Sequence, residues 1–274
     1  MRSVLATAVI ATAALTSACS TTVTGAAAPA GPTTIAPNAL AASVVVPALP
    51  DGISIDGEVA VPGDFEPGSR IFGADAGGGV APCSVGLRLV EGLSTAAHCG
   101  VTGSPATLSG GSRVGYFEKS VHENTASAGD PILDFAVVQL DGPMPPAPVE
   151  IADRPVSGVL TTKASMSLQP GTIMCFDGAE SGRSCGPLLD VNAERLKVDV
   201  PSLPGDSGSS VFLVDPKTQT VVLVATLKGR VNGAMGATYL DAALEAAQAT
   251  ALVDAAAAKA VAGNPYYSSR VSPR

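Results

Sequence analysis

Three short stretches of the chain hold residues that could carry out acyl transfer. The stretch GLSTAAHCG contains His98, one of only two histidines in the chain. The stretch PGDSGSSV places Ser207 among glycines, which let the backbone turn sharply so that neighbouring N–H groups converge on one point. The stretch DPILDFAVVQL contains Asp134 at the start of an apolar run. A serine nucleophile needs a histidine base, and that base needs a carboxylate to fix its tautomer.

Each stretch also has a purely structural interpretation. His98 could be a half-buried histidine beside a structural cysteine, and a GDSG string also occurs in simple turns. Asp134 is preferred to Asp130 as the carboxylate because it opens an apolar strand, where it can be held rigid and dry, whereas Asp130 precedes a proline. The second histidine, His122, and Asp130 are interpreted as loop residues. The three stretches together favour the catalytic interpretation.

The elements that must position these residues are short. From Ile71 onward, apolar runs alternate with glycine, proline and aspartate clusters, a pattern typical of many short antiparallel strands. The candidate strands are Ser84–Leu89, Leu93–Ala97, Arg113–Lys119, Phe135–Leu140, Val159–Thr162, Thr172–Phe176, Leu196–Val200, Ser210–Val214 and Val221–Leu227. A proline-rich connector, DGPMPPAPVEIADRP, divides them into two groups of similar length. This pattern predicts two packed β-barrels.

The C-terminal part has a different composition. Residues 240–262 are rich in alanine and lack internal glycine or proline, which predicts one long helix that stops at Gly263. Residues 264–274 are expected to form a mobile tail.

The N-terminal residues resemble an export signal. Arg2 precedes an apolar run, Val4–Leu15, that is too short and too rich in threonine for a membrane span. The following TSAC is similar to the lipobox of bacterial lipoproteins, in which the signal is cut before the cysteine and the thiol carries lipid. An ordinary secretory signal is the alternative. The expected segments are a signal peptide (1–18), a lipidated Cys19 with an Ala/Pro/Thr-rich tether (19–50) and a possible pro-segment (51–70).

Charge and cysteine content narrow the possible partners. With 24 acidic and 16 basic residues the net charge is -8, so there is no electrostatic footprint for nucleic acid or for an anionic membrane surface. Membrane contact is therefore expected only through the lipid anchor.

The chain has five cysteines, an odd number for an exported protein. A lipidated Cys19 would leave four for two disulfides, whose pairing the count alone does not decide.

The order of His98, Asp134 and Ser207 is that of chymotrypsin-like serine proteases, and the chain resembles their bacterial streptogrisin and alpha-lytic endopeptidase branch. CSVGLRL followed by STAAHCG resembles the first disulfide of that branch, which implies a Cys83–Cys99 bond. CFDGAESGRSCG resembles its second disulfide loop, which implies a Cys175–Cys185 bond. The resemblance covers about residues 71–250.

The resemblance implies an all-β protease domain of two packed six-stranded antiparallel β-barrels followed by the C-terminal helix. The implied bounds are 71–263 for the domain and about 71–145 and 156–240 for the barrels. It also implies that Ser207 attacks a peptide carbonyl, that His98 transfers the proton and that Asp134 orients His98. The N–H groups of Gly205 and Ser207 would hold the oxyanion. We expect no metal or organic cofactor, a protein or peptide substrate, and a monomer.

Two departures from the family pattern concern the catalytic machinery. Leu227 stands where the family commonly has a serine that supports the aspartate, so Asp134 is expected to have one hydrogen-bond donor fewer. Ser209 replaces the second glycine of the usual GDSGG. Both departures leave open a protein that keeps the fold and has lost useful turnover.

A further departure concerns the buried Asp206, which many bacterial relatives neutralise with an arginine. That position is Phe176 here, so another cation is expected, because an unpaired buried charge is costly. The candidates are Arg183 and a new N-terminus at Ile71, since SR-IFG resembles the activation site of animal chymotrypsin-like zymogens. Cleavage after Arg70 would then activate the enzyme and release it from its tether.

The resemblance assigns substrate-binding roles to Pro201, Leu227, Lys228 and Gly229. Pro201 lies at the expected base of the primary pocket, which argues against recognition of arginine or lysine and favours a small or apolar residue. Lys228 near the pocket entrance could instead favour acidic residues.

The leading hypothesis is an extracytoplasmic serine endopeptidase. The alternatives are a protease-fold lipoprotein that binds a partner in the cell envelope without turnover, and an esterase that uses the same triad.

Overall fold

A computed structural model of the chain describes residues 48–55, 63–123 and 130–274. The predicted signal peptide, Cys19 and most of the predicted tether lie outside these residues. Among the helices in the described ranges, none has both the length and the apolar character needed to cross a membrane. The signal, the lipid and the segment boundaries therefore stay predictions.

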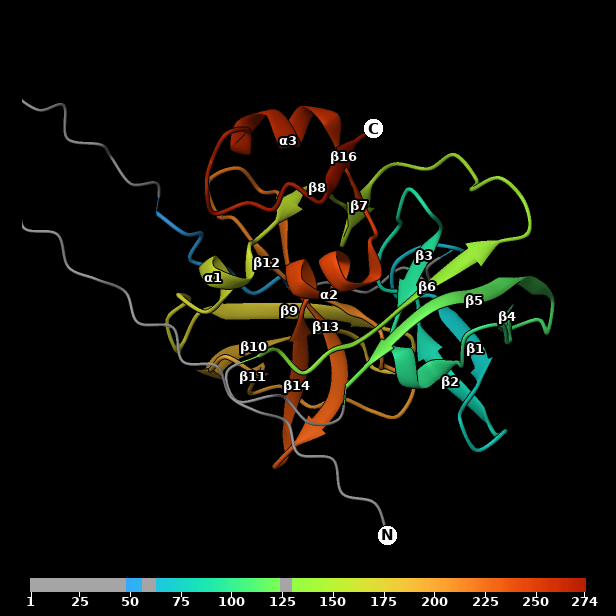
Figure 1. Ribbon diagram of the computed structural model, residues 1–274. Coiled ribbons are helices and arrows are strands. Elements are labelled where there is room, and N and C mark those ends of the chain that lie inside the picture. The colour runs from blue at the N-terminus through green and yellow to red at the C-terminus, as the bar shows by residue number, and fades with distance from the viewer. Residues whose placement is uncertain (1–47, 56–62, 124–129) are drawn as a thin grey trace, which may run out of the picture. The chain divides into compact units, whose positions relative to one another are not determined.

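The first half of the domain is a six-stranded antiparallel sheet that forms a half-barrel (Figure 1). In spatial order its strands are β2 (Val80–Ser84), β1 (Arg70–Ala74), β4 (Pro105–Leu108), β5 (Arg113–His122), β6 (Asp134–Leu140) and β3 (Leu93–Thr95). Its interior is filled by fully buried side chains that include Ile71, Phe117 and Val138. A short 3-10 helix, η1 (Ala97–Cys99), follows β3.

The second half contains a closed six-stranded barrel. Its strands are β12 (Ser210–Val214), β9 (Ile173–Gly178), β10 (Gly182–Val191), β11 (Leu196–Val198), β14 (Ala234–Tyr239) and β13 (Val221–Val231). The ring closes because β12 pairs with both β9 and β13. Two further strands, β7 (Glu150–Ile151) and β8 (Arg154–Val159), extend the sheet beyond β13, and α1 (Thr162–Ser165) follows them. Met174, Phe176 and Tyr239 lie in the interior.

A third buried cluster joins the two sheets. It contains Phe135 and Val137 from β6, Phe212 and Leu223 from the second barrel, and Leu240. Leu240 begins helix α2 (Leu240–Ala247), which packs against β5, β6 and β13. The half-barrel, the closed barrel and helix α2 thus all contribute side chains to this cluster, which fixes the two sheets against each other.

The predicted all-β architecture of two barrels followed by a helix is confirmed, although the first barrel is open. Two predicted strands are misplaced. Strand β2 ends at Ser84, before most of the predicted strand Ser84–Leu89. Strand β8 ends at Val159 because the Thr161 hydroxyl accepts a hydrogen bond from the Ala164 N–H and so begins α1.

The prediction of one continuous helix over 240–262 is wrong. Helix α2 ends at Ala247, and Gln248 takes the left-handed conformation with a φ of 51°. An extended strand, β15 (Ala251–Val253), follows, and α3 (Ala255–Val261) begins where the Asp254 side chain accepts two backbone N–H groups. The side chains of β15 are buried, so tertiary packing overrides the helix propensity of the alanines.

The C-terminal residues are ordered, which corrects the prediction of a mobile tail. Strand β16 (Val271–Pro273) pairs in parallel with β15. Before it, Tyr267 forms a bridge with Leu160, and the Ser268 N–H donates to the Val159 carbonyl at 2.8 Å. These residues therefore belong to the fold and cover the end of β8.

Described residues before Ile71 also contact the domain. Ile55 is buried in the cluster between the sheets. Gly52 has a φ of 69°, and a Cβ there would lie 2.2 Å from the Ile173 carbonyl oxygen, so this close approach requires glycine. The Gly68 N–H donates to the Val85 carbonyl at 2.8 Å. The predicted pro-segment is thus partly packed on the domain.

Candidate active site

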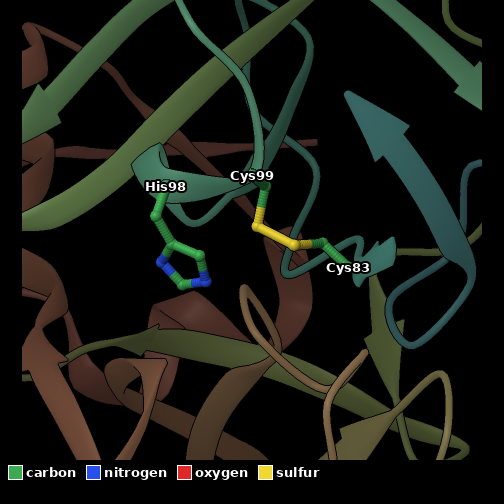
Figure 2. A group of neighbouring side chains, drawn as sticks. All are labelled: Cys83, His98 and Cys99. Carbon is green, nitrogen blue, oxygen red and sulfur yellow. A yellow bond between two sulfur atoms is a disulfide. The ribbon is translucent and has the colours of Figure 1, made fainter. Parts of the chain in front are cut away.

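His98 lies on η1, next to a disulfide that the resemblance implied. Cys99 bonds to Cys83 at the end of β2, with a Cα–Cα distance of 6.1 Å (Figure 2). Cys83, His98 and Cys99 are the one group of potential metal ligands that lie together in the described ranges, and the disulfide uses both sulfur atoms. The disulfide therefore anchors the helix that carries His98 to the neighbouring strand.

Asp134 holds His98 through two hydrogen bonds. The His98 Nδ1 lies 2.7 Å from Oδ2 of Asp134, and the His98 backbone N–H donates to Oδ1 at 3.0 Å. Burial raises the pKa of Asp134, but the hydrogen bonds and charge of His98, with a contribution from Lys228, outweigh it and lower the pKa. An ionised Asp134 that accepts from Nδ1 leaves Nε2 of the neutral ring as a proton acceptor.

His122 is not a loop residue as predicted. It is the last residue of β5, opposite Asp134 in the ladder with β6. Its ring centroid lies 6.4 Å from that of His98. Strand β5 continues beyond the predicted end at Lys119 because it pairs with β6 along its whole second half. The only two histidines of the chain are thus neighbours.

Ser207 lies in the loop before β12, against the segment that carries His98. Its carbonyl accepts a hydrogen bond from the Ser84 N–H at 2.8 Å. Gly208 has a φ of 94°, and a Cβ there would lie 2.3 Å from the Thr95 hydroxyl oxygen and 2.8 Å from the Ala96 nitrogen. In the described part of the chain, Ser207 and His98 form no hydrogen bond. Such bonds are often long in unliganded enzymes and tighten when substrate binds.

Two backbone N–H groups beside Ser207 lack an acceptor. The Asp206 N–H donates to the Leu203 carbonyl, and the Gly208 N–H donates to the Leu227 carbonyl, at 3.0 and 2.9 Å. By contrast, the N–H groups of Gly205 and Ser207 donate to no described residue. Gly205 has a φ of 114°. A pair of unused donors next to a serine is the arrangement that oxyanion binding requires.

The Asp206 side chain is fully buried, and among the residues that the structure describes no cation pairs with it. Arg183 instead binds Asp177 through its Nε and Nη2, at 2.9 and 3.0 Å. Ile71 lies inside β1, where it pairs with Cys83, and is fully buried. Arg183 is therefore engaged elsewhere, and in the uncut chain the Ile71 nitrogen belongs to a strand, so the N-terminus proposed to form on cleavage stays a prediction.

Four hydrogen bonds hold the Asp206 carboxylate instead. Oδ1 accepts from the backbone N–H groups of Glu180 and Ser181, at 3.1 and 2.9 Å. Oδ2 accepts from the Ser181 hydroxyl at 2.5 Å and from the Leu203 N–H at 2.7 Å. Three of these donors are backbone N–H groups, which residue types do not reveal, so this arrangement could not be predicted from the sequence.

Leu227 and Lys228 contact the site in different ways. The Leu227 side chain is buried in the second barrel, and its backbone N–H donates to the Ser209 carbonyl at 2.8 Å. The Lys228 ammonium lies 3.8 Å from Oδ2 of Asp134 and 3.3 Å from the Glu123 carbonyl oxygen. The lysine, which the sequence placed only at a pocket entrance, thus supplies a cation where the serine of the family pattern is missing.

A cavity of about 250 Å³ adjoins this lysine. It is lined by Ile132, Arg195, Lys228, Gly229, Arg230, Val231, Gly236, Ala237 and Thr238. Three of these residues are basic, and most of the exposed lining is apolar. Pro201 is exposed and is not among the residues that line this cavity.

Ser209 and the second disulfide lie near the loop that carries Ser207. Ser209 is fully buried, and within the described ranges its hydroxyl has no hydrogen-bond partner. Cys175 and Cys185 form the second disulfide that the resemblance implied, between paired positions of β9 and β10 with a Cα–Cα distance of 4.1 Å. This bond braces the hairpin whose turn contacts Asp206.

Comparison with known proteins identifies the fold. No family profile and no curated protein sequence matches the chain. Among solved structures, Thermobifida fusca protease A is 18% identical with a TM-score of 0.51, and the match covers 69% of this chain and 98% of that one. Cellulomonas bogoriensis chymotrypsin is 21% identical with a TM-score of 0.48, covering 69% and 98%. The domain therefore has the chymotrypsin-like fold.

Proposed function

We propose that this protein is a serine endopeptidase in which Ser207, His98 and Asp134 form the catalytic triad. The observation that carries the proposal is the doubly hydrogen-bonded pair of His98 and the buried Asp134, with the Ser207 loop packed on the same segment. This pair directs the second ring nitrogen away from the carboxylate, and that nitrogen is the atom needed to take a proton from serine.

In the proposed reaction, the Ser207 oxygen forms a bond to the peptide carbonyl carbon while its proton passes to Nε2 of His98. The carbonyl oxygen becomes an oxyanion, which the unused N–H groups of Gly205 and Ser207 stabilise. His98 then returns the proton to the departing amine, and an acyl-enzyme remains. Water, deprotonated by His98, then attacks the ester carbonyl, the bond to the Ser207 oxygen breaks, and His98 returns the proton to Ser207 as the acid product leaves. Throughout, Asp134 stabilises the imidazolium.

Export is part of the proposal. Two disulfides in the described domain fit an oxidising compartment, where such bonds persist. The proposed location is the outer side of the cell membrane, with the domain tethered through a lipid on Cys19 or released from it. Substitution of Cys19 by alanine should move the protein from the membrane fraction to the soluble exported fraction. An unchanged distribution would contradict the anchor.

A fluorophosphonate probe tests the catalytic proposal directly, because it reacts only with an activated serine. The wild type should be labelled, whereas Ser207→Ala and His98→Ala should not. The matched control is Ser167→Ala, which removes an exposed hydroxyl that bonds to the Lys163 carbonyl. Labelling that persists in Ser207→Ala would contradict the assignment. Peptide and ester substrates, compared on the labelled protein, would then separate an endopeptidase from an esterase.

One observation favours a second function. Ser207 and His98 share no hydrogen bond in the described structure, and Ser209 and Leu227 depart from the family pattern. A protein with this fold could bind a partner in the envelope without turnover. A wild type that resists the probe while Ser207→Ala leaves its fold and its partner binding unchanged would support this binding function.

A further inference from the structure

The turn between β9 and β10 contacts the loop that carries Ser207. Gly178 and Gly182 pair at the end of the hairpin, so residues 179–181 form its tip. A Cβ at Gly178 would lie 2.3 Å from Oδ1 of Asp206, which shows how closely the carboxylate approaches the turn. Glu180 and Ser181 supply three of the four donors to that carboxylate. The turn thus acts as a cradle for Asp206.

The hydrogen bonds to the Asp206 carboxylate also restrict the proposed oxyanion donors. Asp206 stands between Gly205 and Ser207, so fixing its side chain limits the orientation of both neighbouring peptide groups. Independently, the Gly205 carbonyl accepts a hydrogen bond from the Ser84 hydroxyl at 2.8 Å, and that hydroxyl accepts one from the Ala179 N–H at 2.9 Å. The turn is therefore connected to the loop at Asp206 itself and, through the Ser84 hydroxyl, at Gly205.

Arg70 holds the turn from outside. Its Nη2 donates to the Ala179 carbonyl at 3.1 Å and forms an ion pair with the Glu180 carboxylate. Arg70 is also the first residue of β1, where it pairs with Ser84. In the uncut chain, the Arg70–Ile71 peptide bond therefore lies within the pairing of β1 with β2. The Arg70 side chain is bound to the turn at Ala179 and Glu180.

Cleavage after Arg70 would not readily supply a cation to Asp206. Ile71 is fully buried and pairs with Cys83 and Leu108. A new ammonium group at Ile71 could reach Asp206 only if the start of β1 left these partners. The carboxylate already accepts four hydrogen bonds, so a cation would have to displace existing donors.

We propose that residues 179–181, clamped by Arg70, hold the Ser207 loop in its working form, so that the chain with an intact Arg70–Ile71 bond is the active enzyme. Ser181, Glu180 and Arg70 are then positioning residues, which act on the reaction through Asp206. This inference rests on the proposed endopeptidase function, and it replaces activation by cleavage with a preformed network of hydrogen bonds.

The first test follows the uncut chain. The wild type is labelled with the fluorophosphonate probe and its mass is measured, with peptide mapping across residues 70 and 71. Label on chains in which this bond is intact supports the proposal. Label found only on chains that begin at Ile71 overturns it. A wild type without label would contradict both the proposed function and the active intact form.

The second test changes the donors. Ser181→Ala removes the hydroxyl donor, and we expect kcat to fall about tenfold with KM within about twofold, because a hydrogen bond to a charged group is lost. Ser181→Thr restores the hydroxyl and should restore kcat, whereas Ser167→Ala should not change it. A Ser181→Ala enzyme with wild-type kcat would overturn the positioning role. Urea midpoints of all variants identify any that simply unfold.

The third test separates a clamp from a cleavage site. Glu180→Gln weakens the ion pair with Arg70 without touching the Arg70–Ile71 bond, and it should lower kcat about threefold. If Arg70 acted only as a cleavage site, Glu180→Gln would match the wild type and Arg70→Gln alone would be inactive. Hydrogen exchange over residues 203–209 gives a readout free of activity. Faster exchange in Ser181→Ala supports the hold on the loop, and unchanged exchange overturns it.

Discussion

Asp134 begins β6 in the half-barrel and Asp206 precedes β12 in the closed barrel, and neither carboxylate has exposed surface. The groups around them differ in kind. Asp134 faces an imidazole and an ammonium group, both of which can change their charge. Asp206 faces three backbone N–H groups and one hydroxyl, none of which ionises in the ordinary pH range. The first environment suits proton transfer, and the second suits a fixed support.

The largest effect is expected from Asp134→Asn. The neutral amide carries no negative charge with which to accept from the Nδ1–H group of His98. It also favours the tautomer with the proton on Nε2, which cannot take a proton from serine. Reaction with the fluorophosphonate probe should be about 10⁴-fold slower. The urea midpoint is measured in parallel, and a loss below about tenfold in a folded variant would show that Asp134 has no role in the triad.

Asp206→Ala should affect stability instead. It leaves four donors without an acceptor in a buried place, so the free energy of unfolding should fall by about 3 kcal/mol. Asp206→Asn keeps an acceptor oxygen and should lose less. Urea denaturation gives both values. Equal losses for the two variants would mean that charge, and not hydrogen bonding, holds this loop.

The pH dependence of stability tests the ionised state assigned to Asp134 in this comparison with Asp206. The pKa of Asp134 is lowered in the folded protein, so its ionised form stabilises the fold above the unfolded value of about 3.9. This contribution is lost as the pH falls through the lower folded pKa. The stability difference between wild type and Asp134→Asn should therefore stay constant near neutrality and shrink below about pH 4. A difference that grows in acid would contradict the assigned direction.

The smallest effect concerns the basic residues of the cavity beside Lys228. In the described ranges Arg230 forms no ion pair, although it lines this cavity. If the cavity receives substrate side chains, Arg230→Met should lower kcat/KM about threefold for peptides with glutamate on the N-terminal side of the cleaved bond, relative to alanine. Arg113→Met, which breaks an exposed pair with Asp141, is the control. Identical ratios in both variants would exclude such a preference.

The candidate triad was chosen from local motifs, and the structure brings His98 and Asp134 together and packs the Ser207 loop on the same segment. Cys83, His98 and Cys99 lie within 17 residues of one another in the sequence, and the disulfide between the two cysteines is the one that the resemblance implied. Asp134 was preferred to Asp130 because it opens an apolar strand, where a carboxylate can be held rigid and dry, and it lies 2.7 Å from the His98 ring. The two barrels followed from short apolar runs that alternate with turn residues.

The features that sequence reasoning missed depend on contacts between distant segments. Lys228 lies on β13 of one sheet and reaches Asp134 on β6 of the other, at a point where the register of β13 with β14 shifts. The helix over 240–262 was mispredicted because alanine favours a helix, whereas the pairing of β15 with β16 is set by packing. The donors to Asp206 are mostly peptide groups, which every residue carries and no pattern distinguishes.

Ser207 belongs to one barrel and the His98–Asp134 pair to the other, and the cluster around Phe135 and Phe212 joins them. Reactivity between two separately supported groups falls steeply with small displacements, by about 100-fold for 1 Å. A slight shift of one barrel against the other would therefore separate the proposed nucleophile from its proposed base while each barrel stays folded. Substitutions in the apolar cluster around Phe135 and Phe212 should therefore change the proposed activity without touching any of the proposed reacting groups.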